Sequence, residues 1–334
     1  MGDNAFPEDG DSVDVTFVVI GFNEGPTLRA SLDSCRDADL RDVTHELIYV
    51  DGGSTDDSVA IARSAATDRI LGGDKRRRAA ENRNLGLMHA RGEYVQFVDG
   101  DMTIAPDWPL AAVAFLHNHA ECAAVCGHIH EANPSRLFRA LQMDWAPREG
   151  YIRHCGGAAM YRKSALERMG GFPEDVAYGE EPYLCWRLRN ELGLRIYQLH
   201  RLMAHHDLGF SGVRDYWRRN VRCGMTYAEI AARCRRGKER LWMRESLRNL
   251  AWLGAWIALA CMIAGGGTLL RAFVVGAAAG VLLRKFLHTR RKGCSNAVAA
   301  IYACHTYFCK IPIAWGELKW LAARLPRLAR GGTL

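Results

Sequence analysis

Two aspartates with only one glycine between them follow a short apolar run. Asp99 and Asp101 flank Gly100 and come directly after "YVQFV" at 94–98. These β-favouring residues predict a strand buried on both faces of a parallel sheet, and ligands bind beyond the carboxyl ends of such strands. Two carboxylates this close repel each other unless a positive charge lies between them or one of them takes up a proton. The pattern therefore predicts a divalent cation at the edge of a sheet.

Polar loops follow two earlier apolar runs in the same way. The run 15–21 precedes Asn23 and Glu24, and the run 46–50 precedes Asp51. Strand, loop and helix repeat about three times before residue 101, which predicts an α/β fold with a doubly wound, mostly parallel sheet. The loops should gather along one edge, as they do in a nucleotide site. Neither GxGxxG nor GxxxxGK[ST] follows the first run, which argues against a Rossmann dehydrogenase and against a P-loop protein.

The composition separates an acidic first part from a basic second part. Residues 201–334 hold 23 of the 44 Lys and Arg but only 6 of the 37 Asp and Glu. Such a region attracts nucleic acid or an anionic membrane surface, and its long apolar segments favour the membrane, with no nucleic-acid partner. The 11 Cys form no CxxC pair, which is typical of reduced thiols in a cytosolic compartment. Residues 1–12 predict a flexible, acidic N-terminus without the features of a signal peptide.

Residues 249–283 form a long apolar segment with a single charge, Arg271, and basic clusters on both sides. If both clusters stay in the cytoplasm, the segment enters the membrane and returns, with residues 265–267 near the tip. Each arm has about 15 to 17 residues, below the roughly 20 that span hydrocarbon, so short transmembrane helices and a re-entrant hairpin both remain open. The stretch 297–325 mixes Trp, Tyr and Lys with apolar residues, which suits an interfacial or transmembrane helix. We expect residues 231–334 to form a basic, apolar helical region.

Six short fragments occur in a fixed order along the first part of the chain. They are "VVIGFNE", "VDGGSTDDS", "RNLGLMHARGEYVQFVDGDM", "GGAAMYRKSALERMGGF", "GEEPYLCWRLR" and "HHD". Together they resemble a bacterial family-2 glycosyltransferase over residues 13–230. The resemblance implies a GT-A fold and inverting transfer of a sugar from a UDP- or GDP-linked donor to an acceptor hydroxyl. With the apolar segments it implies an enzyme of the inner membrane, its catalytic domain facing the cytoplasm and its acceptor a lipid-linked or growing glycan.

The resemblance also assigns roles to individual residues. Asp99 and Asp101 match the DxD motif that holds Mg²⁺ or Mn²⁺ on the donor diphosphate, and hard oxygen ligands suit such cations. His206 matches a further metal contact. Arg219 and Arg222 are assigned to the leaving diphosphate, although the phosphate of a lipid acceptor or anionic headgroups would suit them equally. The other positions implied for the nucleotide-sugar are Asn23, Glu24, Asp51, Arg83, Gly156 and Gly157, together with Asp99 itself.

The fragment "GEEPYLCWRLR" occupies the place of the family's Glu-Asp motif, whose acid removes the acceptor proton. Glu181 stands where Asp is usual, so its side chain is one methylene longer, and Glu180 is a helper or a substitute for it.

Two rival functions remain. A nucleotidyltransferase that makes nucleotide-sugars would need a Gly-rich loop with Arg or Lys after the first strand, which "GFNEGPTLR" supplies poorly. A membrane-bound glycan-binding protein of the same fold would not need the acidic set.

Overall fold

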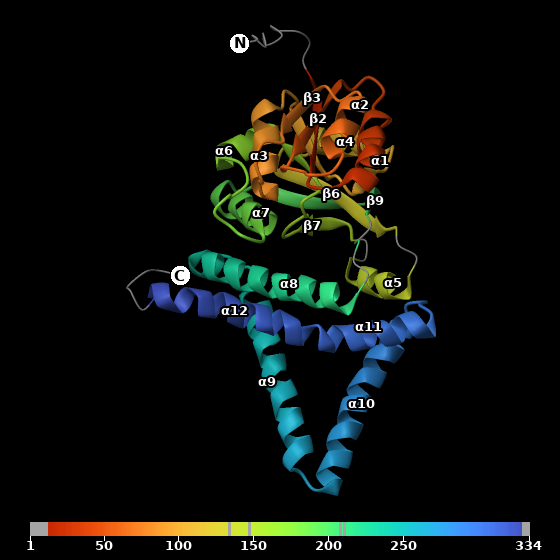
Figure 1. Ribbon diagram of the computed structural model, residues 1–334, viewed down its shortest axis with the longest axis vertical. Coiled ribbons are helices and arrows are strands. Elements are labelled where there is room, and N and C mark those ends of the chain that lie inside the picture. Colours follow the sequence, from red (N-terminus) through yellow and green to blue (C-terminus); the bar gives the residue numbers. More distant parts are fainter. Residues whose placement is uncertain (1–12, 133–134, 146–147, 207–208, 210–211, 329–334) are drawn as a thin grey trace. The chain divides into compact units, whose positions relative to one another are not determined.

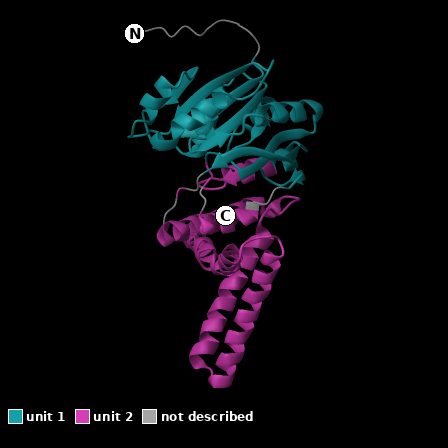
Figure 2. Ribbon diagram, turned by 90° about the vertical axis from the view of Figure 1, so that its right-hand side faces the viewer, with its two compact units in different colours: residues 1–129, 147–174, 187–206 teal, residues 130–146, 175–186, 207–334 magenta. Residues whose placement is uncertain are grey.

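The structure, a computed structural model, describes residues 13–132, 135–145, 148–206, 209 and 212–328 (Figure 1). The N-terminus expected to be flexible, residues 1–12, lies outside the described residues, and so does Asp207. The chain divides into two compact units (Figure 2). Unit 1 consists of residues 1–129, 147–174 and 187–206, and unit 2 consists of residues 130–146, 175–186 and 207–334.

Unit 1 is built around a mixed sheet with the strand order β3-β2-β1-β4-β8-β6-β9-β5, and β7 pairs with β9. The strands are β1 Val15–Gly21, β2 His45–Asp51, β3 Arg69–Gly72, β4 Tyr94–Asp99, β5 Met102–Ile104, β6 Cys122–Glu131, β7 Gly150–Ile152, β8 Met160–Arg162 and β9 Arg195–His206. β1, β2, β3 and β4 are joined in parallel, whereas β8 joins β4 and β6, and β9 joins β5 and β7, in antiparallel pairs. The three apolar runs predicted as buried strands are β1, β2 and β4, and they form the buried centre of the parallel half.

Helices flank the sheet of unit 1: α1 Gly25–Arg36, α2 Ser58–Ser64, α3 Ala79–His89, α4 Trp108–Asn118 and α6 Lys163–Met169. α3 begins with a capping box, in which the backbone N–H of Arg78 donates to Glu81 Oε2 at 2.6 Å. Further along α3, a Cβ added at Gly86 would overlap the side chain of Val18 on β1. The glycine therefore lets α3 lie close against β1, which fixes the position of Arg83 one turn earlier.

Unit 2 is helical in its C-terminal part and contains α5 Arg136–Gln142, α8 Val213–Arg233, α9 Met243–Gly265, α10 Thr268–Arg290, α11 Asn296–Phe308 and α12 Lys310–Leu328. α8 and α12 lie side by side (Figure 1). A Cβ added at Gly224 would overlap the carbonyl of Ile313, and one added at Gly316 would overlap the carbonyl of Val221. The two helices thus approach at backbone distance, which only glycine permits.

The predicted apolar hairpin is formed by α9 and α10. Gly266 and Gly267 separate the two helices, in agreement with a tip at residues 265–267. Each helix has 23 residues and continues into the flanking basic clusters, so each is about 35 Å long. Met243–Gly265 and Asn296–Leu325 are long and apolar enough to cross a membrane, but the second stretch breaks at Cys309 between α11 and α12. Its apolar window is 44% buried in the structure, compared with 6% for α9, so α9 has far less cover from protein.

Candidate active site

The carboxyl ends of β1 and β4 bring three acidic side chains together. Ile20 on β1 lies opposite Asp99 on β4, and the N–H of Gly100 donates to the carbonyl of Ile20 at 2.8 Å. Glu24 precedes α1 directly after β1, and Asp101 precedes β5. Burial, followed by the negative charges of Asp101 and Asp99, raises the pKa of Glu24 to about 7. Such crowding of carboxylates matches the cation site that the sequence predicts.

His206 reaches the same place from the far end of the sheet. β5 pairs antiparallel with β9, and this register sets Met102 opposite His206. His206 Nε2 lies 3.2 Å from Asp101 Oδ2 as a result. The other oxygen, Asp101 Oδ1, is buried and has no hydrogen-bond partner within the described part of the chain. A buried carboxylate oxygen that lacks a donor, next to a second carboxylate and an imidazole, is a donor set that suits a divalent cation.

Arg83 is held against the first aspartate of the pair. Its side chain is only 4% exposed, and its Nη2 donates to Asp99 Oδ1 at 2.8 Å. A Cβ added at Gly157 would overlap this guanidinium, with Arg83 Cζ only 3.1 Å away. Gly156 has open space around it, but its φ of +89° is one that side chains rarely adopt. Of the two glycines singled out in the sequence, Gly157 therefore leaves room for Arg83, and Gly156 provides this backbone conformation.

Asn23 and Asp51 are placed to shape the loops after β1 and β2. Asn23 Oδ1 accepts from the N–H of Thr55 at 2.8 Å, and the φ of Asn23 is +58°. Asp51 is fully buried, and its Oδ2 accepts from the N–H groups of Gly53 and Ser54 at 2.9 and 2.8 Å. Its Oδ1 accepts from the Tyr49 hydroxyl at 3.0 Å. Neither Asn23 nor Asp51 is among the residues that line the cavity described next.

A cavity of about 280 Å³ in unit 1 is lined by the ends of β1 and β4, by the residues that follow these strands, and by α3 with the residues just before it. Its lining residues are Ile20, Gly21, Phe22, Glu24, Arg76, Arg77, Ala79, Asn82, Arg83, Asp99, Gly100 and Asp101. Phe22, Arg76, Arg77 and Asn82 were not singled out in the sequence. The Arg76 guanidinium lies 3.4 Å from the centroid of the Phe22 ring, and its Nη1 donates to the carbonyl of Gly52 at 3.2 Å. The basic run 75–78, just before α3, is the signal that could have indicated these arginines.

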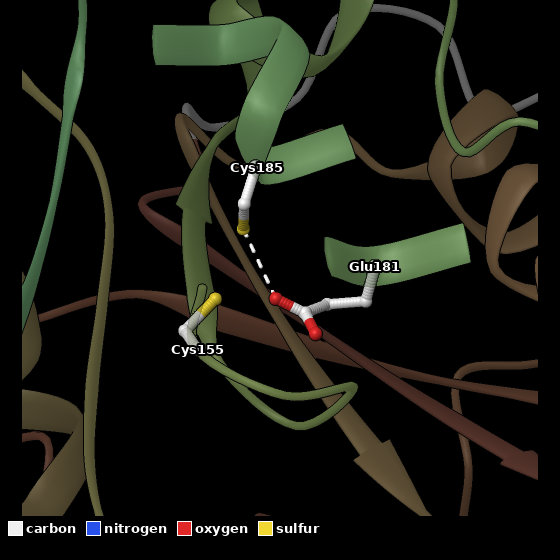
Figure 3. Close-up of side chains that lie close together, drawn as sticks. All are labelled: Cys155, Glu181 and Cys185. Carbon is white, nitrogen blue, oxygen red and sulfur yellow. Dashed lines mark hydrogen bonds between the residues drawn. The ribbon is translucent and has the colours of Figure 1, made fainter. Parts of the chain in front are cut away.

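The predicted general bases stand at the start of α7, Glu180–Glu191. Glu181 is 5% exposed, and its Oε1 accepts a hydrogen bond from the thiol of Cys185 at 3.0 Å (Figure 3). Glu180 is half-buried beside it. Both glutamates belong to unit 2, as do the exposed Arg219 and Arg222 on α8, whereas Glu24, Arg83, both aspartates and His206 belong to unit 1. Unit 1 thus brings together Arg83 and the three predicted metal ligands, whereas the predicted bases and the two arginines of α8 belong to unit 2.

Comparison with known proteins finds glycosyltransferases that are similar to part of this chain. Residues 16–170 match the family model described as glycosyl transferase family 2. The chain is 26% identical over 189 residues to the O-antigen chain rhamnosyltransferase WbaN of Salmonella anatum. This aligned stretch covers 52% of this chain and 60% of that protein. It is 29% identical over 238 residues to the pre-mycofactocin glycosyltransferase of Mycobacterium tuberculosis, covering 66% and 48%. The chain thus spans about half of the length of these two relatives.

Solved structures confirm the predicted GT-A fold class. The mannosyltransferase PcManGT from Pyrobaculum calidifontis, in complex with GDP-Man and Mn²⁺, superposes with a TM-score of 0.68 at 23% identity, over 91% of this chain and 86% of that one. Residues 1–349 of S. aureus TarS, in complex with UDP-GlcNAc, give a TM-score of 0.53 at 18% identity, over 92% of both chains. At these identities the likeness shows the fold alone. The match of residues 16–170 to glycosyl transferase family 2 agrees with this fold.

Proposed function

We propose that this protein transfers a sugar from a UDP- or GDP-linked donor to an acceptor hydroxyl, with inversion, in the synthesis of a cell-surface polysaccharide or glycolipid. The observation that carries the proposal is the cavity of unit 1, in which Glu24, Asp99 and Asp101 face Arg83. Relatives named for O-antigen and succinoglycan synthesis support the product class. Structural neighbours bound to GDP-Man and UDP-GlcNAc support the donor class. A nucleotidyltransferase is disfavoured by the family match.

Asp99, Asp101 and His206 would hold Mg²⁺ or Mn²⁺. The buried Asp101 Oδ1 is available as a ligand, and His206 Nε2 lies beside Oδ2 of the same carboxylate. A bound cation supplies charge neutralisation on the departing nucleoside diphosphate. Arg83 holds Asp99 in place and offers its guanidinium to a donor phosphate. Arg76, stacked on Phe22, provides a second cation at the rim of the cavity.

Glu181 would act as the general base that removes the proton of the acceptor hydroxyl. Its hydrogen bond with the Cys185 thiol fixes one carboxylate oxygen on the first turn of α7. As general base, the Glu181 carboxylate would take up the proton of the acceptor hydroxyl while the acceptor oxygen attacks the anomeric carbon. Glu180 lies one residue earlier on the same turn and is the alternative base.

The hairpin would place the reaction at the cytoplasmic face of the inner membrane. The apolar parts of α9 and α10 lie between basic residues at 244 and 248 and at 284 and 285. Lys and Arg concentrate in cytoplasmic segments, so both ends of the hairpin would stay in the cytoplasm. Nucleotide-sugars are soluble there, and a lipid-linked or growing glycan acceptor would meet them at the membrane surface.

A nucleotide-release assay on the purified full-length protein tests the enzyme against a non-catalytic glycan-binding protein. UDP- and GDP-sugars are offered with Mn²⁺, with Mg²⁺ and with EDTA, and release of UDP or GDP is measured. We expect release from one donor class, loss with EDTA, and recovery when the cation is restored. Asp107→Asn is the matched control for Asp101→Asn and should release nucleotide as wild type does, because Asp107 is an exposed aspartate that pairs with Arg201. Glycan binding without nucleotide release from any donor would refute the proposal.

The choice between the two glutamates is tested separately. Glu181→Gln should lower kcat by about 10²–10⁴-fold, the usual contribution of a general base, while donor affinity stays close to that of wild type. Glu180→Gln should change kcat much less. If Glu180→Gln produces the larger loss, the two roles are exchanged.

A further inference from the structure

The first helix of the hairpin, α9, has a single buried residue, and that residue is polar. Asn249 is 1% exposed, whereas the other residues of α9 are partly or largely exposed. Asn249 Nδ2 donates to Glu317 Oε1 on α12 at 2.9 Å, and Glu317 is fully buried. The most deeply buried side chain of α9 is therefore bonded to a carboxyl group of another helix of unit 2.

Two oxygens of this pair lack a donor. Asn249 Oδ1 and Glu317 Oε2 are both buried, and neither has a hydrogen-bond partner within the described part of the chain. Buried polar atoms without a partner are rare in folded proteins, and burial of an ionised carboxylate carries a further penalty because of its charge. The two oxygens therefore call for a hydrogen-bond donor.

Three helices enclose Glu317. From α9, Ser246 lies beside the carboxyl group together with Asn249, and neither side chain is charged. α8 faces it with backbone, since a Cβ added at Gly224 would lie only 3.1 Å from the backbone nitrogen of Glu317. Among the described residues, the charged group that acts on Glu317 is Lys310, two turns earlier on α12 itself. One cation at that separation does not replace the water that a buried carboxylate has lost.

A single proton would satisfy both oxygens. An ionised carboxylate only accepts hydrogen bonds, whereas a protonated one has a hydroxyl that donates. A proton on Glu317 Oε2 can be donated to Asn249 Oδ1, which belongs to the amide that already bonds the other carboxyl oxygen. Carboxyl group and amide then each donate once and accept once, in a ring of two hydrogen bonds. The buried charge disappears at the same time.

We propose that folded unit 2 keeps a proton on Glu317 at pH values at which exposed glutamates have lost theirs, and that this proton latches α9 to α12 through Asn249. The latch stands at the root of the hairpin, because residue 249 begins the apolar segment. Loss of the proton would leave a charge and two unpaired acceptors between the helices, so α9 would separate from α12. The root of the hairpin is thereby sensitive to pH, whatever reaction the protein catalyses.

Infrared spectroscopy tests the proton directly, because a protonated carboxyl group has a carbonyl stretching band that ionised carboxylates lack. The full-length protein is measured at pH 6 in dodecyl maltoside, a detergent without carbonyl groups. Glu317→Gln can form the same two hydrogen bonds with Asn249, so it should fold and lose part of the band. Glu167→Gln, at an exposed glutamate of α6, should keep the whole band, and any contribution of Glu24 is common to both variants. Equal bands in the two variants would mean that Glu317 is ionised, with water or a cation at the two oxygens, and would overturn the proposal.

Hydrogen exchange tests the latch. Wild type and Glu317→Gln are compared at pH 6 and at a higher pH at which the Glu317 band has disappeared, since comparison at one pH cancels the intrinsic dependence of exchange on pH. Peptides that cover residues 243–252 should exchange equally in the two proteins at pH 6, and at least threefold faster in wild type at the higher pH. Peptides that cover α6 should exchange alike throughout. Equal exchange of residues 243–252 after the band has disappeared shows that the proton does not hold α9, and the latch is then refuted.

Discussion

Glu24 offers a direct test of the crowded acidic site, because replacing it with Gln removes one charge and keeps the shape of the side chain. The pKa of Glu24 is raised from 4.5 to about 7 by burial and by Asp101 and Asp99. Between these two values the unfolded chain releases the proton while the folded protein keeps it. The wild-type protein without added cation therefore loses stability as pH rises from about 4.5 to about 7, and the loss is constant above that range.

The size of this effect follows from the pKa shift. A rise from 4.5 to about 7 corresponds to about 3 kcal/mol at about 1.4 kcal/mol per unit. Glu24 is only partly buried, so solvent screening reduces the expected effect to on the order of 1–2 kcal/mol. Glu24→Gln should match wild type at pH 4 and be more stable by this amount above pH 7. For a unit of this size, this corresponds to a rise of a few degrees in melting temperature.

The measurement is a series of thermal unfolding curves in detergent from pH 4 to pH 8.5 with EDTA present. Glu167→Gln serves as control, because Glu167 is an exposed glutamate on α6. Its melting temperature should follow that of wild type across the series. A constant difference between Glu24→Gln and wild type at every pH would show that the three carboxylates do not share one electrostatic site.

Three further changes test other parts of the structure. Asp101→Asn should abolish cation-dependent nucleotide release, by at least about 100-fold in a release assay, because it replaces the proposed ligand. Gly157→Ala should displace the guanidinium of Arg83 from Asp99 and raise the KM for the donor, which a donor titration measures; an unchanged KM would refute this contact. Gly224→Leu should prevent α8 from packing on α12, so that unit 2 is lost on purification or melts at least several degrees lower, since overpacking against a rigid backbone costs about 1–3 kcal/mol or more. Wild-type melting behaviour of that variant would refute the close approach of the two helices.

The parallel half of the sheet could be predicted because its strands are continuous apolar runs. β1, β2 and β4 are buried along nearly their whole length, and such runs differ clearly from the polar loops that follow them. β5 and β8 have only three residues each, too few for a period to be recognised. The turn of the hairpin was predictable because glycines interrupt an apolar segment. The break at Cys309 was not, since the apolar pattern continues through it.

The chemistry of the site was predictable in part, because an acidic residue directly after an apolar run can be recognised in the sequence as a side chain at the carboxyl end of a strand. Asp99, Asp101 and Glu24 do gather at one edge, and His206 meets Asp101 through the pairing of β5 with β9. That pairing joins residues about a hundred positions apart, so no local sequence pattern predicts it. Phe22 was not predicted, because a single apolar residue next to Asn23 and Glu24 gives no sign of a role in the site.

The position of Arg83 shows how missing side chains set the geometry of the site. Gly86 brings α3 against Val18, and Gly157 leaves the space that the guanidinium fills. Arg83 is thus confined from both sides and can meet Asp99 with little freedom to move. Asp101 has no comparable partner among the described cations: it meets only the imidazole of His206, and its Oδ1 has no donor. One aspartate is therefore held by an arginine, while the other keeps a carboxylate oxygen for the proposed cation, for which oxygen ligands are suited.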